Sequence, residues 1–145
     1  MSHSDNEVPG KAAGFTLVEL LVVLVILGLI VGLVAPQVIK YLGSSKAKAT
    51  QIQVERISTV LDLYSLDVGR YPSTAEGLDA LVNRPQDLDS WNGPYIRKAD
   101  SLVDPWGKPY VYVSPGQNGA FDLYSLGADG QPGGEGENAD VNSWQ

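Results

Sequence analysis

The sequence predicts an α+β fold, in which one long N-terminal helix packs on a small C-terminal domain with a short helix and a small antiparallel β-sheet. Two observations predict the helix: a long apolar run near the N-terminus, and an amphipathic pattern of helical period directly after it. A third observation is that short strand-like segments, separated by turn residues, fill the C-terminal third. Strands that follow helices, without regular alternation, are typical of α+β domains.

The apolar run predicts a membrane-spanning first half of the helix. Nearly every residue from 15 to 35 is apolar, and Glu19 is the one charged residue among them. About 21 helical residues measure about 31 Å, which matches the hydrocarbon core of a bilayer. A carboxylate such as Glu19 is costly in lipid, so it needs a partner or a function. Pro36 removes one helical hydrogen bond and is expected to loosen or bend the helix there.

The second half of the helix is predicted to be amphipathic and to pack on a globular domain. Five residues at helical spacing share one face. They are Ile57, Val60, Leu61, Tyr64 and Val68. Gly69, followed by Tyr71-Pro72, predicts that the helix ends at about residue 68.

The rest of the chain is predicted to form the small domain. Residues 73–83 are expected to form a short helix, with Ser73 or Thr74 as its cap. Residues 110–113 and 120–126 read as two strands of an antiparallel hairpin, and residues 140–144 as a short edge strand. The predicted organisation is therefore a leader at 1–14, a transmembrane helix at 15–42 and a globular domain at 43–145.

Composition excludes several classes of function. The chain has 145 residues and a net charge of −7, which argues against a basic nucleic-acid-binding surface. It has no cysteine, and its one histidine is His3. A chain cut after Gly14 would therefore lack both residue types, which excludes disulfides, thiol nucleophiles, Ser-His-Asp triads and most zinc sites. No pair of carboxylates is set in an identifiable catalytic cleft, so we expect no enzyme.

A small residue directly before the apolar run indicates an unusual processing site. Secretory signal peptides are cut after their apolar region. Here Gly14 precedes it, so cleavage between Gly14 and Phe15 would leave the whole apolar segment on the mature chain. Gly14, Phe15, Thr16, Leu17 and Glu19, followed by the apolar segment, resemble the class III signal of type IV pilins and pseudopilins.

The resemblance extends over nearly the full length to one branch, the major pseudopilins of the bacterial type II secretion system. The stretches that carry it are Tyr71-Pro72, Asp104-Pro105-Trp106-Gly107, residues 124–130 and Trp144. It implies removal of the leader by a prepilin peptidase, N-methylation of Phe15, and roles in assembly for Glu19 and Pro36.

The resemblance also implies a place in the cell and a set of partners. The chain is expected in the inner membrane, in contact with lipid before assembly, with a cytoplasmic N-terminus and a periplasmic C-terminal domain. It would then form a homo-oligomeric helical filament, the periplasmic pseudopilus, which helps to export folded proteins across the outer membrane. Minor pseudopilins and the inner-membrane secretion platform would be its other partners. The alternatives are a type IV pilin for adhesion or DNA uptake, and a signal-anchored periplasmic enzyme.

An acidic, glycine-rich stretch follows the second predicted strand. Its acidic residues are Asp129, Glu135, Glu137 and Asp140. From the residues alone, two readings stay open: a solvated surface loop, or a calcium loop in which glycine turns present oxygen ligands. The resemblance favours calcium. It implies ligands from the side chains of Asp129, Asp140 and Ser143 and from the carbonyls of Leu126 and Gln131.

Overall fold

We describe residues 13–145 of a computed structural model. This part of the chain forms two compact units, one ending at Val38 and one comprising Ile39–Gln145. Each unit is described by itself. The predicted leader, residues 1–14, lies mostly outside the described residues.

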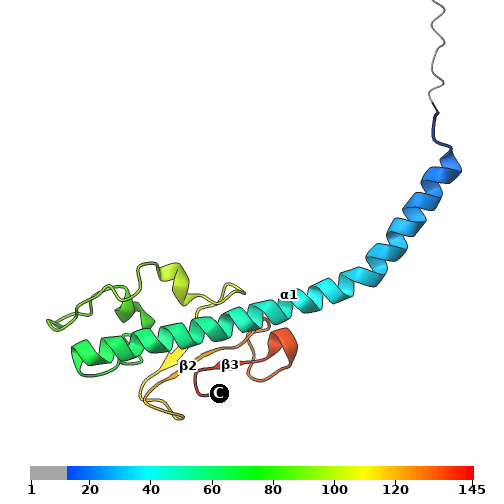
Figure 1. The fold of residues 1–145 in the computed structure, drawn as a ribbon. Coiled ribbons are helices and arrows are strands. Elements are labelled where there is room, and N and C mark those ends of the chain that lie inside the picture. The colour runs from blue at the N-terminus through cyan, green and yellow to red at the C-terminus, as the bar shows by residue number, and fades with distance from the viewer. Residues whose placement is uncertain (1–12) are drawn as a thin grey trace, which may run out of the picture. The chain divides into compact units, whose positions relative to one another are not determined.

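The long helix is confirmed as α1, Leu17–Val68, a continuous α-helix of 52 residues (Figure 1). It ends where the sequence predicted. Gly69 adopts a left-handed φ of 86°, and its N–H donates to the carbonyl of Ser65 over 2.8 Å. Glycine reaches this conformation without a steric penalty, which is why helices commonly end there. Pro36 lies inside the helix.

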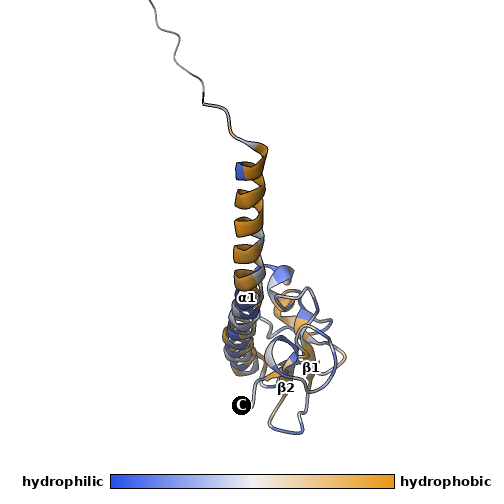
Figure 2. Ribbon diagram, turned by 90° about the vertical axis from the view of Figure 1, so that its right-hand side faces the viewer, coloured by the Kyte–Doolittle hydropathy of each residue, from blue (hydrophilic) through white to orange (hydrophobic). Residues whose placement is uncertain are grey.

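The first unit exposes an apolar surface on all sides of the helix. An 18-residue window of α1 near its start has a mean hydropathy of 3.1, and none of it is buried within the chain. Figure 2 shows this half of α1 as almost uniformly hydrophobic. A helix that is apolar all round is stable only when another apolar phase covers it. By length and composition this one is able to cross a membrane.

The second unit has its core between the amphipathic half of α1, the turns after it and a small sheet. The buried residues of α1 are Gly43, Thr50, Val54, Ile57, Leu61 and Tyr64. The predicted face is thus confirmed at Ile57, Leu61 and Tyr64, while Val60 and Val68 are partly buried against the core. Gly43 was not predicted there. The side chain of Glu137 lies directly on it and leaves no room for a Cβ.

The sheet has three antiparallel strands in the order β1-β2-β3. They are β1 (Val111–Val113), β2 (Asp122–Ser125) and β3 (Val141–Asn142). The register pairs Tyr112 with Leu123, and both side chains are buried toward the core. The predicted hairpin and edge strand are confirmed, though each strand is shorter than predicted. The carboxylate of Asp122 accepts hydrogen bonds from the backbone of Gln117 and Asn118, which anchors the hairpin loop.

The prediction of a helix at residues 73–83 is wrong for most of this segment. The segment forms a turn and then a short 3₁₀ helix, η1 (Leu78–Leu81). Gly77 has a φ of 61°, which an α-helix does not tolerate, so the turn before it cannot continue into a helix. Ser73 does act as a cap, since its Oγ accepts from the N–H of Glu76 (3.2 Å) while Glu76 accepts from the N–H of Ser73 (2.7 Å). Two further 3₁₀ turns are η2 (Ala99–Leu102) and η3 (Gly136–Asn138), of which η3 lies within the glycine-rich stretch after the second strand.

Candidate functional site

The predicted cleavage site lies on an accessible stretch just before α1. Gly14 and Phe15 precede the first helical residue, and both are exposed. The side chain of Phe15 is 87% exposed. A peptide bond outside regular structure is open to the active site of a protease.

Glu19 forms a reciprocal hydrogen-bonded pair with Thr16 at the start of α1. The N–H of Glu19 donates to Thr16 Oγ1 over 3.2 Å, and the N–H of Thr16 donates to Glu19 Oε2 over 3.4 Å. This arrangement is a capping box, and it places the carboxylate against the positive end of the helix dipole. The carboxylate is solvent-exposed in this geometry. It lies within one helical turn of the amine that cleavage after Gly14 would create.

The acidic loop, which we define as residues 126–140, is closed on itself by backbone hydrogen bonds. The N–H of Ala128 donates to the carbonyl of Glu137 over 2.8 Å, which joins the two arms. Asp140 Oδ2 accepts from the N–H of Gly133 (2.8 Å), and Asp129 Oδ1 accepts from the N–H of Gln131 (3.0 Å). The loop therefore has a defined conformation, in which Asp129 and Glu135 are exposed while Glu137 and Asp140 are partly buried.

The structure brings some of the predicted calcium ligands together and leaves others apart. Leu126 and Asp140 line one cavity of about 410 Å³, beside Tyr124 and Trp144 on the outer face of the sheet. Asp129, Gln131 and Ser143 do not line this cavity. Ser143 Oγ instead accepts from the N–H of Leu123. Within residues 13–145, no group of three acidic, histidine or cysteine side chains is close enough to hold a metal.

One atom in the loop still points to a cation. Asp140 Oδ1 is buried and has no hydrogen-bond donor among the described residues. A buried carboxylate oxygen without a partner carries a desolvation cost that a bound cation would remove. The predicted ligand atoms are all oxygens, which suits calcium. The residues therefore fit a calcium ion centred on Asp140 better than one centred on Asp129.

A buried acid that the sequence analysis named within a motif, but did not assign to any site, holds the start of the loop. Asp104 is 5% exposed. Its Oδ1 accepts from the N–H groups of Trp106 (3.1 Å) and Lys108 (2.9 Å), and its Oδ2 accepts from Ser125 Oγ (2.7 Å). Ser125 Oγ in turn accepts from the N–H of Gly127. The Asp-Pro-Trp-Gly turn was visible in the sequence, but its link to Ser125, 21 residues on, was not.

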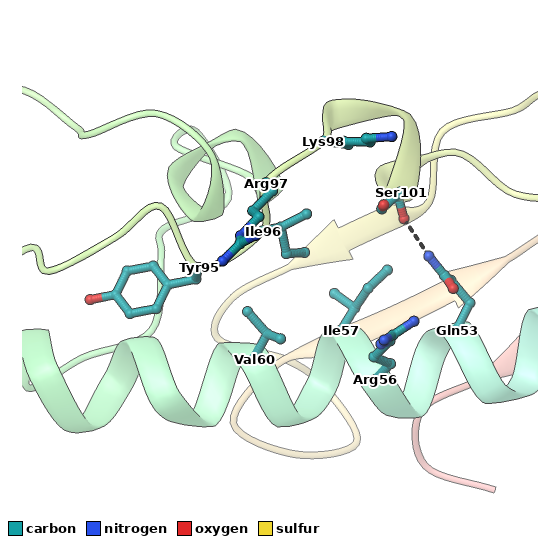
Figure 3. Close-up of a pocket in the computed structure, with 9 residues that line it drawn as sticks. All are labelled: Gln53, Arg56, Ile57, Val60, Tyr95, Ile96, Arg97, Lys98 and Ser101. Atoms are coloured by element: carbon teal, nitrogen blue, oxygen red, sulfur yellow. Dashed lines mark hydrogen bonds between the residues drawn. The ribbon is translucent and has the colours of Figure 1, made fainter.

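A second cavity, of about 310 Å³, lies between α1 and the segment at residues 95–101 (Figure 3). Gln53 Nε2 bridges the two elements by donating to the carbonyl of Ser101 over 2.8 Å. Three cationic side chains line this basic pocket. They are Arg56, Arg97 and Lys98. The ion pairs found among residues 13–145 join Arg70 to Glu76 and Arg84 to Asp89, so none of the three is neutralised by them.

Comparisons with known proteins match both parts of the chain. Residues 37–144 match the family "Type II secretion system (T2SS), protein G", and residues 10–35 match the prokaryotic N-terminal methylation motif. The type II secretion system core protein G of Pseudomonas aeruginosa is 46% identical, over 92% of this chain and 96% of that protein. The protein of the same name from Vibrio cholerae is 41% identical, over 92% of each.

A solved structure agrees with these relatives. It is the crystal structure of the major pseudopilin from the type 2 secretion system of enterohaemorrhagic Escherichia coli. The two structures superpose with a TM-score of 0.56 at 34% identity, over 69% of this chain and 87% of that one.

Proposed function

Because the chain belongs to the type II secretion system protein G family, we infer that it is a major pseudopilin, the structural subunit of the type II secretion pseudopilus. The observation that carries this conclusion is the apolar half of α1, which nothing else in residues 13–145 covers. In a filament subunit this surface would face lipid before assembly and the same helix of other copies afterwards. The family thus explains a feature that would be a liability in a soluble enzyme.

The first half of α1 anchors the subunit in a membrane. We propose that this is the inner membrane, with the N-terminus cytoplasmic and the unit Ile39–Gln145 periplasmic. The match to the methylation motif supports processing at its front edge. A prepilin peptidase would cut between the exposed Gly14 and Phe15, and the new amine of Phe15 would be methylated.

Assembly would use the carboxylate of Glu19. Its capping-box partner, Thr16, is the second residue of the chain that cleavage would produce. The amine of Phe15 in a neighbouring copy would offer Glu19 a stronger, charged partner at the same depth in the apolar phase. Pairing would neutralise both charges and fix the axial register of a head-to-tail filament, in which each contact repeats without closing. Pro36 would let the helix adapt at this packing step.

The basic pocket supports a contact between the units Ile39–Gln145 of neighbouring copies in the filament. Its three cations stand on a chain whose net charge is −7, so every copy presents more acid than base to its neighbours. A carboxylate from the next copy, inserted between Arg56 and Arg97, would find both charge and an apolar floor at Ile57. Minor pseudopilins and the inner-membrane secretion platform would meet the same filament at its ends.

Calcium would neutralise the acidic loop and tie its ends together when bound. Asp140 is the residue best placed to hold it, with the carbonyl of Leu126 on the same cavity. Asp129, Ser143 and the carbonyl of Gln131 would have to turn toward it. A ligand at a hundredfold excess over its Kd stabilises the folded state by about 2.7 kcal/mol. We therefore expect chelation to lower the Tm of the unit Ile39–Gln145.

The calcium proposal has a matched control in the same loop. Asp140→Ala is expected to lower the Tm in calcium buffer to that of the chelated protein, and to make it insensitive to chelator. Glu135→Ala removes an equal charge outside the ligand set, and should keep the chelator effect. Identical melting curves with and without chelator, together with no metal by elemental analysis, would reject calcium.

Secretion tests the function itself. In a strain that lacks its own major pseudopilin, this chain is expected to restore release of a type II substrate into the medium. The same chain without residues 15–42 should not restore it. Substrate that stays in the periplasm in both strains would contradict the proposed role.

A further inference from the structure

We propose that the side chain of Lys108 is a built-in cation that holds the first turn of the acidic loop, residues 127–130. A divalent cation would then order only the second part of the loop, residues 131–140. This inference rests on the calcium site proposed above, which it divides into a half held by lysine and a half held by metal.

The ammonium group of Lys108 sits directly on the backbone of the first turn. Its Nζ donates to the carbonyl of Ala128 over 2.6 Å and reaches the carbonyl of Gly127 at 3.4 Å. It also lies 2.9 Å from where a Cβ at Gly130 would stand, so the turn wraps closely around it. Neither of the ion pairs found in residues 13–145 involves Lys108. Its positive charge therefore interacts with carbonyl oxygens, as the charge of a metal ion would.

Lys108 is held in place by the same buried acid that fixes the start of the loop. Asp104 makes two hydrogen bonds to the backbone of Lys108. Its side-chain Oδ1 accepts the N–H of Lys108, and its own N–H donates to the carbonyl of Lys108 (2.7 Å). Through Ser125, Asp104 also fixes the N–H of Gly127. Asp104 therefore fixes both the backbone of Lys108 and the turn that the lysine side chain contacts. This lowers the entropy cost of extending a long side chain across the turn.

Within residues 13–145, no Lys or Arg side chain is hydrogen-bonded to the second part of the loop. Residues 131–136 are exposed, and the N–H of Gly133 donates to Asp140 Oδ2. The other oxygen of Asp140 is the buried one without a donor. The carbonyls that Lys108 holds, those of Gly127 and Ala128, are also not in the predicted calcium set. The two cations would therefore bind different oxygens of one loop.

Two effects of Lys108 on calcium have opposite signs. A nearby positive charge repels the ion, whereas an ordered first turn prepares the carbonyl of Leu126 to bind it. Our proposal requires ordering to win, so removing the lysine should weaken calcium binding. If charge repulsion dominated, the same change would tighten it.

Amide hydrogen exchange tests the division, measured by NMR on the processed full-length protein in detergent micelles. The N–H of Gly127, which donates to Ser125 Oγ, reports on the lysine-held half, and that of Gly133 reports on the metal-held half. In the wild type, chelator should speed exchange at Gly133 by about tenfold or more and leave Gly127 unchanged. In Lys108→Met, Gly127 should also speed up by about tenfold or more in chelator, since the charge-assisted bonds that hold its turn are lost. Lys108→Arg keeps the charge and should behave as the wild type.

Isothermal titration then gives the sign of the coupling. Calcium should bind Lys108→Met about tenfold more weakly than the wild type, with binding by Lys108→Arg close to normal. Equal or tighter binding by Lys108→Met would overturn the proposal. So would exchange at Gly127 that is the same in all three proteins.

The two proposals can fail separately. If the wild type binds no calcium and exchange at Gly133 does not respond to chelator, the calcium site is wrong. The comparison of exchange at Gly127 in the wild type and in Lys108→Met still decides the role of Lys108. Exchange at the amide of Tyr95, which donates to the carbonyl of Leu81 away from the loop, shows whether each variant is folded. A Lys108→Met protein that is unfolded there is replaced in the comparison by Lys108→Gln.

Discussion

Removal of the buried carboxylate of Asp104 should strongly destabilise the unit Ile39–Gln145. Asp104→Ala leaves three donors without their acceptor: the N–H groups of Trp106 and Lys108, and the hydroxyl of Ser125. A hydrogen bond to a charged group contributes about 1.5–3 kcal/mol, and an unsatisfied buried donor costs about 1–3 kcal/mol. Because the three bonds share one acceptor, their effects are not additive.

We therefore expect Asp104→Ala to lower the free energy of unfolding by about 3–5 kcal/mol, a large share of the 5–15 kcal/mol typical of a domain. Asp104→Asn keeps Oδ1 for both N–H groups, and its amide donates to Ser125 Oγ in place of accepting. It should cost about 1–2 kcal/mol. Ser125→Ala removes one bond of the three and should cost a similar amount.

Urea unfolding of the unit Ile39–Gln145, followed by circular dichroism, measures these differences. The order should be wild type, then Ser125→Ala and Asp104→Asn, then Asp104→Ala as the least stable. An Asp104→Ala protein within about 1 kcal/mol of the wild type would show that water replaces the carboxylate, and would refute the reasoning.

Three other changes test separate parts of the account. Gly14→Val should block cleavage by crowding the peptidase, and intact-mass spectrometry should then find only the precursor; normal mature protein would contradict the proposed site. Arg97→Glu reverses a charge in the basic pocket and should reduce filament yield at least tenfold at low salt, whereas Arg84→Glu, outside the pocket, should not; equal yields would exclude the pocket from assembly. The hydrogen bond from Arg70 holds the pKa of Glu76 near 2, down from 4.5, so its stabilisation is complete above pH 4.5 and is lost as the pH falls toward 2. Because the pair is partly exposed, the stabilisation that it contributes is only about 1–2 kcal/mol. Glu76→Gln should lose this stability at pH 7, and its Tm should vary less between pH 5 and 3 than that of the wild type. Parallel pH profiles of Tm for the two proteins would refute this prediction.

Local patterns in the sequence predicted most of the fold. The apolar run, the helical spacing of Ile57, Leu61 and Tyr64, and the stop at Gly69 each depend on residues close together in the chain, and each is confirmed. The helix predicted at residues 73–83 was wrong for an equally local reason. Gly77 takes a left-handed φ. Its neighbours in the sequence are all compatible with helix and do not indicate this conformation.

The candidate sites were less predictable because they depend on contacts between distant residues. The bonds from Asp104 to Ser125 and from Lys108 to Ala128 span about 20 residues, and no periodicity announces them. The basic pocket joins Arg56 on α1 to Arg97 on a loop, and neither residue is unusual alone. The calcium ligands came from a resemblance, and the structure places Leu126 and Asp140 together without their predicted partners.

Negative-stain electron microscopy of filaments sheared from cells shows whether the chain is a filament subunit. The chain is co-expressed with a prepilin peptidase and the other secretion components, and compared with Glu19→Ala. The account predicts thin helical filaments from the wild type, and membrane-inserted, fully processed protein without filaments from Glu19→Ala. Absence of filaments from the wild type at high expression would contradict a filament subunit, and normal filaments from Glu19→Ala would contradict assembly through its carboxylate.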